Sequence, residues 1–75
     1  MDEINKKITS AGYKLTDIIS DKNEFRSWTN FFYTHPNGKT LLYNNSDEVL
    51  IVRDSRRRIL LEGRAKLNID RLNSL

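Results

Sequence analysis

Four short apolar runs dominate the middle of the chain, and none of them alternates cleanly with polar residues. The runs cover residues 31–33, 41–43, 49–52 and 59–61. A strand with one solvated face alternates between apolar and polar side chains, whereas a continuous apolar run is typical of a strand covered on both faces. The pattern therefore predicts a small sheet with more apolar surface than the few helical residues of this chain can cover.

The N-terminal segment has the spacing of a short amphipathic helix over residues 2–11. An apolar face recurs along it at Ile4, Ile8 and Ala11. Its first turn is acidic, which the helix dipole favours. Gly12 suits the left-handed position that ends a helix, with Tyr13 then packing back on Ile8. The apolar spacing also continues beyond this glycine, so a longer helix that reaches Ile19 is the alternative.

After the helix, strands and polar turns alternate up to residue 64. We expect strands over residues 13–19, 28–34, 39–43, 48–53 and 58–64. The strongest turn signal is Pro36 followed by Gly38, because proline suits the second position of a type I turn and glycine suits the left-handed residue after it. Asn68 is a suitable N-cap for a last short helix, whose apolar side chains are Ile69, Leu72 and Leu75.

This order of elements predicts an α+β domain with an N-terminal helix, a four- or five-stranded antiparallel meander sheet and a short C-terminal helix. The runner-up is a small, partly open β-barrel, because curling protects the edges of a sheet. With 75 residues, we expect one domain over residues 1–75. In so small a domain burial and chain entropy nearly balance, which favours self-association or docking on a larger protein.

The composition excludes several kinds of site. The chain has no cysteine and a single histidine, so disulfides and cysteine-bound zinc are excluded, and we expect no metal and no cofactor. The N-terminus is acidic and lacks the apolar stretch of a secretory signal, and no apolar run approaches the ~18 residues of a membrane span. These features favour a cytoplasmic protein with no membrane partner.

A cluster of arginines is the first candidate binding site. The expected tip of the last hairpin and the segments beside it contain Arg53, Arg56, Arg57, Arg58, Arg64 and Lys66. Guanidinium groups pair bidentately with phosphate oxygens, and a two-stranded ribbon fits the major groove of DNA. The net charge is only +3, and Asp54 and Glu62 lie close by, so a solvated turn is the competing interpretation.

Aromatic residues are the second candidate. Adjacent residues of a strand face opposite ways, so Phe31 and Phe32 cannot both enter one core. Exposed aromatic side chains can stack on unpaired bases, although aromatic residues in small domains more commonly form the core. As anchors for a partner we expect Trp28 or Phe32, together with Leu72 and Leu75 of the last helix.

No arrangement of residues in the sequence indicates catalysis. His35 precedes a proline in an expected turn, and the carboxylates match no calcium-loop or nuclease spacing. We therefore expect no catalytic residues and no enzyme. The prediction is a small non-enzymatic protein-interaction module, of inhibitor or adaptor type, that docks through an apolar sheet face on a larger protein or on its own copy as a homodimer. The alternative is a nucleic-acid-binding module that uses the arginine-rich hairpin tip.

Overall fold

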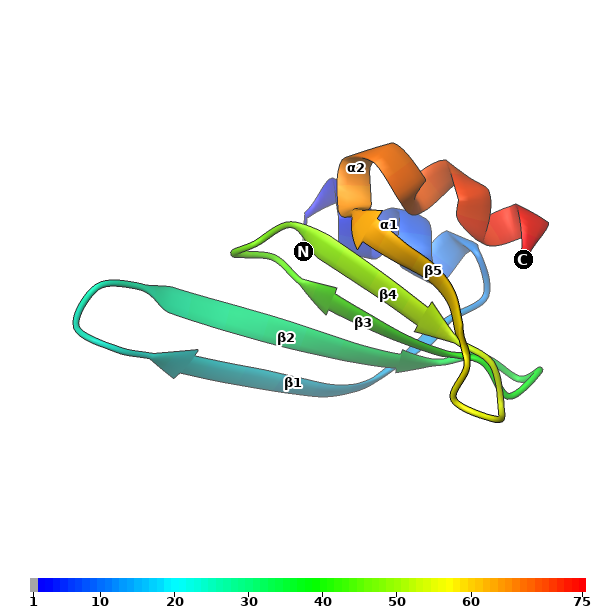
Figure 1. Ribbon diagram of the computed structural model, residues 1–75, viewed down its shortest axis with the longest axis horizontal. Coiled ribbons are helices and arrows are strands. Elements are labelled where there is room, and N and C mark those ends of the chain that lie inside the picture. The colour runs from blue at the N-terminus through cyan, green and yellow to red at the C-terminus, as the bar shows by residue number, and fades with distance from the viewer. Residues whose placement is uncertain (1) are drawn as a thin grey trace.

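The computed structural model describes residues 2–75 as one open sheet with helices at both ends of the chain (Figure 1). The elements are α1 (Glu3–Ser10), β1 (Lys14–Lys22), β2 (Ser27–Thr34), β3 (Thr40–Asn44), β4 (Val49–Arg53), β5 (Ile59–Arg64), α2 (Ala65–Asn68) and the 3-10 helix η1 (Ile69–Ser74). The five strands lie in the order β1-β2-β3-β4-β5, and each pairs with its neighbours antiparallel. The predicted α+β meander is confirmed, and the barrel alternative is wrong because the sheet does not close.

Helix α1 is fixed at both ends by residues next to it in the sequence. The Asp2 carboxylate accepts the backbone N–H of Asn5 at 2.9 Å, which caps the first turn. At the other end, Gly12 has φ +95° and its N–H donates to the Thr9 carbonyl at 3.0 Å, while the Tyr13 N–H reaches the Ile8 carbonyl. This pair of bonds is a Schellman stop. The predicted end at Gly12 is therefore confirmed, and the longer helix is wrong.

The C-terminal helical segment begins at Ala65, four residues earlier than expected and directly after β5. The backbone N–H of Ala65 donates to the Glu48 carbonyl at 2.7 Å, so a contact with the β3–β4 turn fixes the start of α2. Asn68 makes no cap hydrogen bond, and its side-chain amide donates instead to the Arg64 carbonyl at 2.8 Å. The prediction of an Asn68 cap is wrong because the helical segment has already begun at Ala65 and Asn68 is the last residue of α2.

Strand β1 is longer than its sequence indicates. The segment 20–27 was expected to be a loop, yet β1 continues to Lys22 and pairs with β2 as far as Ser27. Cross-strand polar contacts support it, such as the 2.9 Å hydrogen bond between the Ser20 and Thr29 hydroxyls. The resulting β1–β2 hairpin projects beyond the ends of the other strands (Figure 1), and we call its projecting part, residues 20–29, the arm.

Both helical segments cover the same face of the sheet, which we call the inner face (Figure 1). The core lies between them and consists of Ile4, Ile8, Tyr13, Tyr33, Leu41, Tyr43, Leu50, Val52, Leu61, Ala65, Ile69 and Leu72. Two tyrosine hydroxyls of this face bond α1. Tyr33 accepts from the side-chain amide of Asn5, which is 1% exposed, and Tyr43 donates to the Asp2 carboxylate at 3.0 Å.

Each apolar run divides its side chains between the two faces. In β4, for example, Leu50 and Val52 are buried on the inner face, while Val49 and Ile51 point to the other side and are half-buried. Phe31 likewise stacks on Tyr43 with a centroid distance of 5.8 Å, while Phe32 points away. The chain therefore makes a sheet that is apolar on both faces and supplies helices for only one.

Candidate functional site

The face of the sheet opposite the helices, which we call the outer face, carries a continuous apolar row. Phe32 of β2 pairs directly with Leu42 of β3, and Leu42 pairs directly with Ile51 of β4. The row ends at a carboxylate on each side, because Asp17 pairs with Phe32 and Glu62 pairs with Ile51. Directly paired residues point to the same face, so the three apolar side chains form one strip across the centre of the sheet.

A shallow groove of about 230 Å³ follows this strip toward one end of the strands. Its apolar floor is the strip itself, and its polar wall is formed by Thr16, Thr34, Thr40 and Arg53. An apolar centre with hydroxyl and charged groups at the margin is the composition of a protein-binding surface. The groove therefore has the composition of a docking surface.

Of the two predicted aromatic anchors, Phe32 lies at the centre of the outer face and Trp28 lies further along β2, on the arm. Both point to the same face because they are four residues apart in one strand. The Arg26 guanidinium lies over the Trp28 ring at 5.7 Å and pairs with the Asp47 carboxylate at 2.8 Å. This contact joins the arm to the β3–β4 turn and engages one side of Trp28, whereas Phe32 lies at the centre of the outer face beside Leu42.

The two predicted leucine anchors lie away from this face. Leu72 is 5% exposed and belongs to the core beneath η1, so it has no surface to offer a partner. Leu75 is 38% exposed at the C-terminal end of the helical layer (Figure 1). The structure therefore does not bring either leucine together with Trp28 or Phe32.

Three apolar residues that were not singled out from the sequence belong to this surface or extend it. Leu42 and Ile51 complete the central strip, and Phe25 is 89% exposed at the tip of the arm. The signal for the first two is present in the sequence, since one member of each adjacent apolar pair must face outward. Nothing in the sequence marks Phe25 as a binding residue, because a single apolar side chain in a polar turn is ordinary at a protein surface.

The arginine tip lies at the end of the sheet where two hairpin turns meet. A Cβ built on Gly38 in the turn 35–39 would lie 3.1 Å from the Cβ of Ser55 in the turn 54–58. The two turns and the row of paired residues beside them hold six cations, namely Lys14, Lys39, Arg53, Arg56, Arg57 and Arg58. We call this group the basic end. Lys14 and Lys39 were not among the predicted residues, because only the meander places them there.

Arg64 and Lys66, which were predicted to act with these arginines, lie at the opposite end of β5. Arg64 is the last residue of that strand, about 17 Å along it from Ile59 at the usual rise per residue. Lys66 belongs to α2 and lines a pocket between the helices. The structure therefore separates the six predicted cations into one group of four and one pair.

Asp54 is the one carboxylate of the basic end among the described residues, and its oxygens are already engaged. Oδ1 accepts the backbone N–H groups of Arg56 and Arg58 at 2.8 and 2.9 Å, and Oδ2 accepts Nε of Arg58 at 3.0 Å. The Arg58 N–H above all, followed by the other donors of the turn, holds the pKa of Asp54 below its usual value. Asp54 therefore shapes the turn and pairs Arg58, which leaves Arg56 and Arg57 free to bind.

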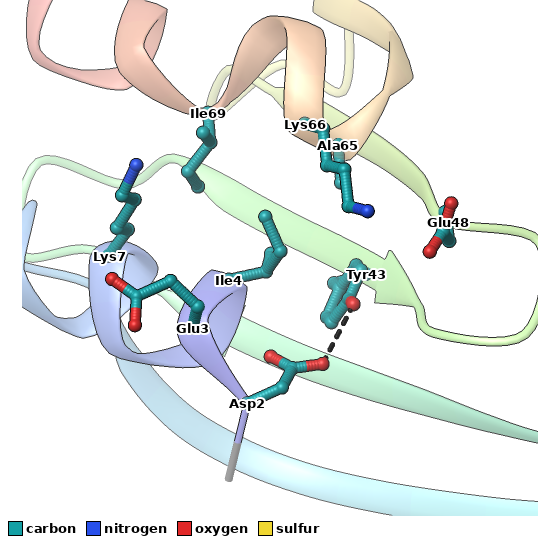
Figure 2. A pocket seen from close by; sticks show the side chains of 9 residues that line it. All are labelled: Asp2, Glu3, Ile4, Lys7, Tyr43, Glu48, Ala65, Lys66 and Ile69. Atoms are coloured by element: carbon teal, nitrogen blue, oxygen red, sulfur yellow. Dashed lines mark hydrogen bonds between the residues drawn. The ribbon is translucent and has the colours of Figure 1, made fainter.

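A second concavity, of about 320 Å³, lies between α1 and α2 (Figure 2). Ile4 and Ile69 line its apolar side, and its mouth carries both signs of charge, with Lys7 and Lys66 facing carboxylates. Burial and the hydrogen bond to Asp2 raise the pKa of Tyr43, so its hydroxyl stays neutral. Within residues 2–75 no group of three or more His, Asp or Glu side chains is placed to hold a metal ion.

His35 has a local structural role in the turn 35–39. Its Nδ1 accepts the backbone N–H of Asn37 at 3.2 Å, and its ring packs edge-on against Tyr13 with a centroid distance of 4.9 Å. The ring also lies against Gly12, where an added Cβ would come within 2.8 Å of Nε2. This contact holds the C-terminal end of α1 against the β2–β3 turn.

No family model, curated protein or solved structure matches the chain. None of the helices in the described part of the chain is long and apolar enough to cross a membrane.

Proposed function

We propose that the protein is a small non-enzymatic protein-interaction module, of inhibitor or adaptor type, that docks on a larger protein through its outer face. The observation that carries the proposal is the strip of Phe32, Leu42 and Ile51, which lies on the face opposite all the helices. Contiguous apolar surface left accessible on a small domain is typical of an interaction site. The proposed anchor is Phe32, with Trp28 beside it on the arm.

The charges around the strip support docking rather than unspecific adhesion. Asp17 and Glu62 lie at its two ends, and Arg53 and Arg64 lie on the same face in the rows beside it. A polar and charged rim around an apolar centre orients a partner and disfavours wrong pairings. The partner is expected to present an apolar ridge with cationic groups near each end of the strip.

The size of the outer face favours a larger partner over a second copy of this chain. The part of the face shared by the five strands is about five residues long, which makes it on the order of 400 Å² from the usual strand spacing and rise. A stable interface buries about 800 Å² per partner. The missing area can come from the arm, whose tip carries the exposed Phe25, if the partner extends beyond the sheet. Two flat sheets stacked face to face would leave the arm tip uncovered.

The test compares two leucines of equal size on opposite sides of the molecule. Leu42→Asp places a charge in the centre of the strip, and Leu67→Asp places the same charge on α2, where the leucine is 75% exposed. Tagged wild type and both variants are used to recover partners from the natural host cells, with quantification by mass spectrometry. We expect one protein to be lost with Leu42→Asp and retained with Leu67→Asp.

Equal recovery with both variants would contradict the proposal. Thermal unfolding of each variant shows whether the fold is intact, and Leu42→Thr, which keeps a strand-forming side chain, replaces the aspartate if it is not. Light scattering of the wild type tests the homodimer in the same preparation. A dimer that is lost in the Leu42 variants alone would assign the outer face to a second copy.

A further inference from the structure

The basic end has a charge balance unlike that of the rest of the molecule. Its six cations and one carboxylate give a surplus of five positive charges, which exceeds the +3 of the whole chain, so the remainder is net negative. Among residues 2–75, the ion pairs of this end comprise only the one between Arg58 and Asp54. Arg53, Arg56 and Arg57 therefore have no carboxylate partner there.

The two turns that form this end have the same backbone geometry. In the turn 35–39 the His35 N–H donates to the Lys39 carbonyl and the Gly38 N–H to the His35 carbonyl, each at 2.9 Å. In the turn 54–58 the Asp54 N–H donates to Arg58 and the Arg57 N–H to Asp54, again at 2.9 Å. Gly38 and Arg57 therefore occupy the same position in equivalent turns.

That shared position has left-handed backbone angles, which glycine adopts without strain and arginine does not. Gly38 has φ +91° and Arg57 has φ +65°. A side chain with a Cβ is disfavoured in this conformation, and such strain in a native structure points to a use for the residue. The first turn uses the unstrained residue, whereas the second has an exposed arginine at this position in spite of the strain.

A line of hydrogen-bond donors continues from these turns across the outer face. Lys14, Thr34, Thr40 and Arg53 pair in sequence across β1, β2, β3 and β4. The line contains ammonium, hydroxyl and guanidinium groups and no carboxylate. These are the side chains that contact phosphate oxygens in nucleic-acid complexes, and guanidinium suits phosphate better than ammonium does because it binds two oxygens at once.

From these observations we infer that the basic end is a binding site for the phosphate backbone of a nucleic acid, with Arg56 and Arg57 as its leading contacts. The site lies at the end of the strands and adjoins the docking groove, with which it shares Thr34, Thr40 and Arg53, whereas Arg56 and Arg57 belong to the basic end alone. Contacts of this kind position a nucleic acid without reading its sequence. Binding is therefore expected to be weakly selective and strongly dependent on salt.

The test measures binding of a labelled 25-base-pair DNA of mixed sequence, and of a 25-nucleotide RNA, by fluorescence anisotropy. In 50 mM salt we expect a Kd on the order of 1–10 μM for the wild type. Arg56→Ala/Arg57→Ala should weaken binding at least about fivefold and lower the salt slope by roughly 2 for the duplex. Lys6→Ala/Lys66→Ala removes the same charge from the exposed side of α1 and α2 and should change the Kd less than about twofold.

A single substitution separates the binding role of Arg57 from a structural one. Arg57→Gly relieves the strained position, so the Tm should rise by roughly 2–6 °C, while the affinity for the duplex should fall by about two- to fourfold. Lower affinity in a more stable protein cannot be explained by damage to the fold. Unchanged affinity in Arg57→Gly would remove Arg57 from the site.

Three results would overturn the inference. The first is a wild type that binds neither probe in 50 mM salt, and the second is an equal loss of affinity in the two double variants. The third is competition by polyglutamate as strong as that by unlabelled DNA of equal charge, which would assign the basic end to an acidic protein. None of these results depends on whether the outer face docks a partner.

Discussion

The two faces of the sheet are built from the same apolar runs but make different use of them. On the inner face, Leu50 and Val52 are fully buried and two tyrosine hydroxyls bond α1. On the outer face, Leu42 and Ile51 remain half-buried with no helix over them. The comparison teaches that the inner face supplies the stability of the fold, so the apolar side chains of the outer face are available for binding. Substitutions on the two faces should therefore separate stability from binding.

The largest difference is expected between two leucines in adjacent strands. Leu50→Ala opens a cavity in the core and should lower the free energy of unfolding by about 2–5 kcal/mol. Leu42→Ala removes the same atoms from the outer face and should cost less than about 1.5 kcal/mol, because solvent fills the space. Urea unfolding of both variants measures the difference. Equal costs would show that the outer face is packed as tightly as the core.

The next effect concerns the polar attachment of α1 to the inner face. Tyr33→Phe removes the hydroxyl that accepts from Asn5 and leaves this buried amide without a partner, at a cost of about 1–3 kcal/mol. The outer-face control is Thr34→Val, whose hydroxyl is exposed and should contribute little. If Tyr33→Phe leaves the urea midpoint unchanged, the buried amide does not stabilise the docking of α1.

The three tyrosines of the chain belong to the core, and their burial makes the folded protein less stable at alkaline pH. Burial raises the pKa of Tyr13, Tyr33 and Tyr43 above 10.0. A tyrosine that ionises in the unfolded chain but not in the native state lowers stability as pH rises above its unfolded pKa, by up to about 1.4 kcal/mol per pH unit. Absorbance at 295 nm should show tyrosine ionisation only together with unfolding. Titration of two or more tyrosines in the folded protein would contradict their burial.

The smallest effect is expected from a polar substitution within the strip. Ile51→Thr keeps a β-branched side chain on the outer face and should change the free energy of unfolding by less than about 1 kcal/mol. The same substitution in the core, Val52→Thr, places a hydroxyl in an apolar site and should cost more than Ile51→Thr. A loss of stability in Ile51→Thr as large as in Val52→Thr would remove the distinction between the faces.

Features that depend on neighbouring residues could be predicted from the sequence. The end of α1 at Gly12 is one case, because the glycine, the carbonyls that it caps and the contact between Tyr13 and Ile8 all lie within six residues. The β2–β3 turn is another, because Pro36 and Gly38 set the backbone directly. The element order followed from these local signals.

Features that depend on pairing between strands could not be predicted. An unbroken apolar run does not say which member faces the helices, and a bulge between Leu15 and Asp17 changes the alternation within β1. The start of α2 depends on a bond from Ala65 to Glu48, and the basic end depends on two turns separated by a full hairpin. The exposed strip and the composite basic end therefore became visible only in three dimensions.

The most direct test of the docking face is photocrosslinking in the cells that make the protein. A benzophenone amino acid is placed at position 42, in the centre of the strip, and in a second strain at position 67, on α2. The account predicts a discrete crosslinked protein from position 42 and none from position 67. A pattern that is the same from both positions, or an adduct from position 67 alone, would contradict the claim that the face without helices is the one that binds.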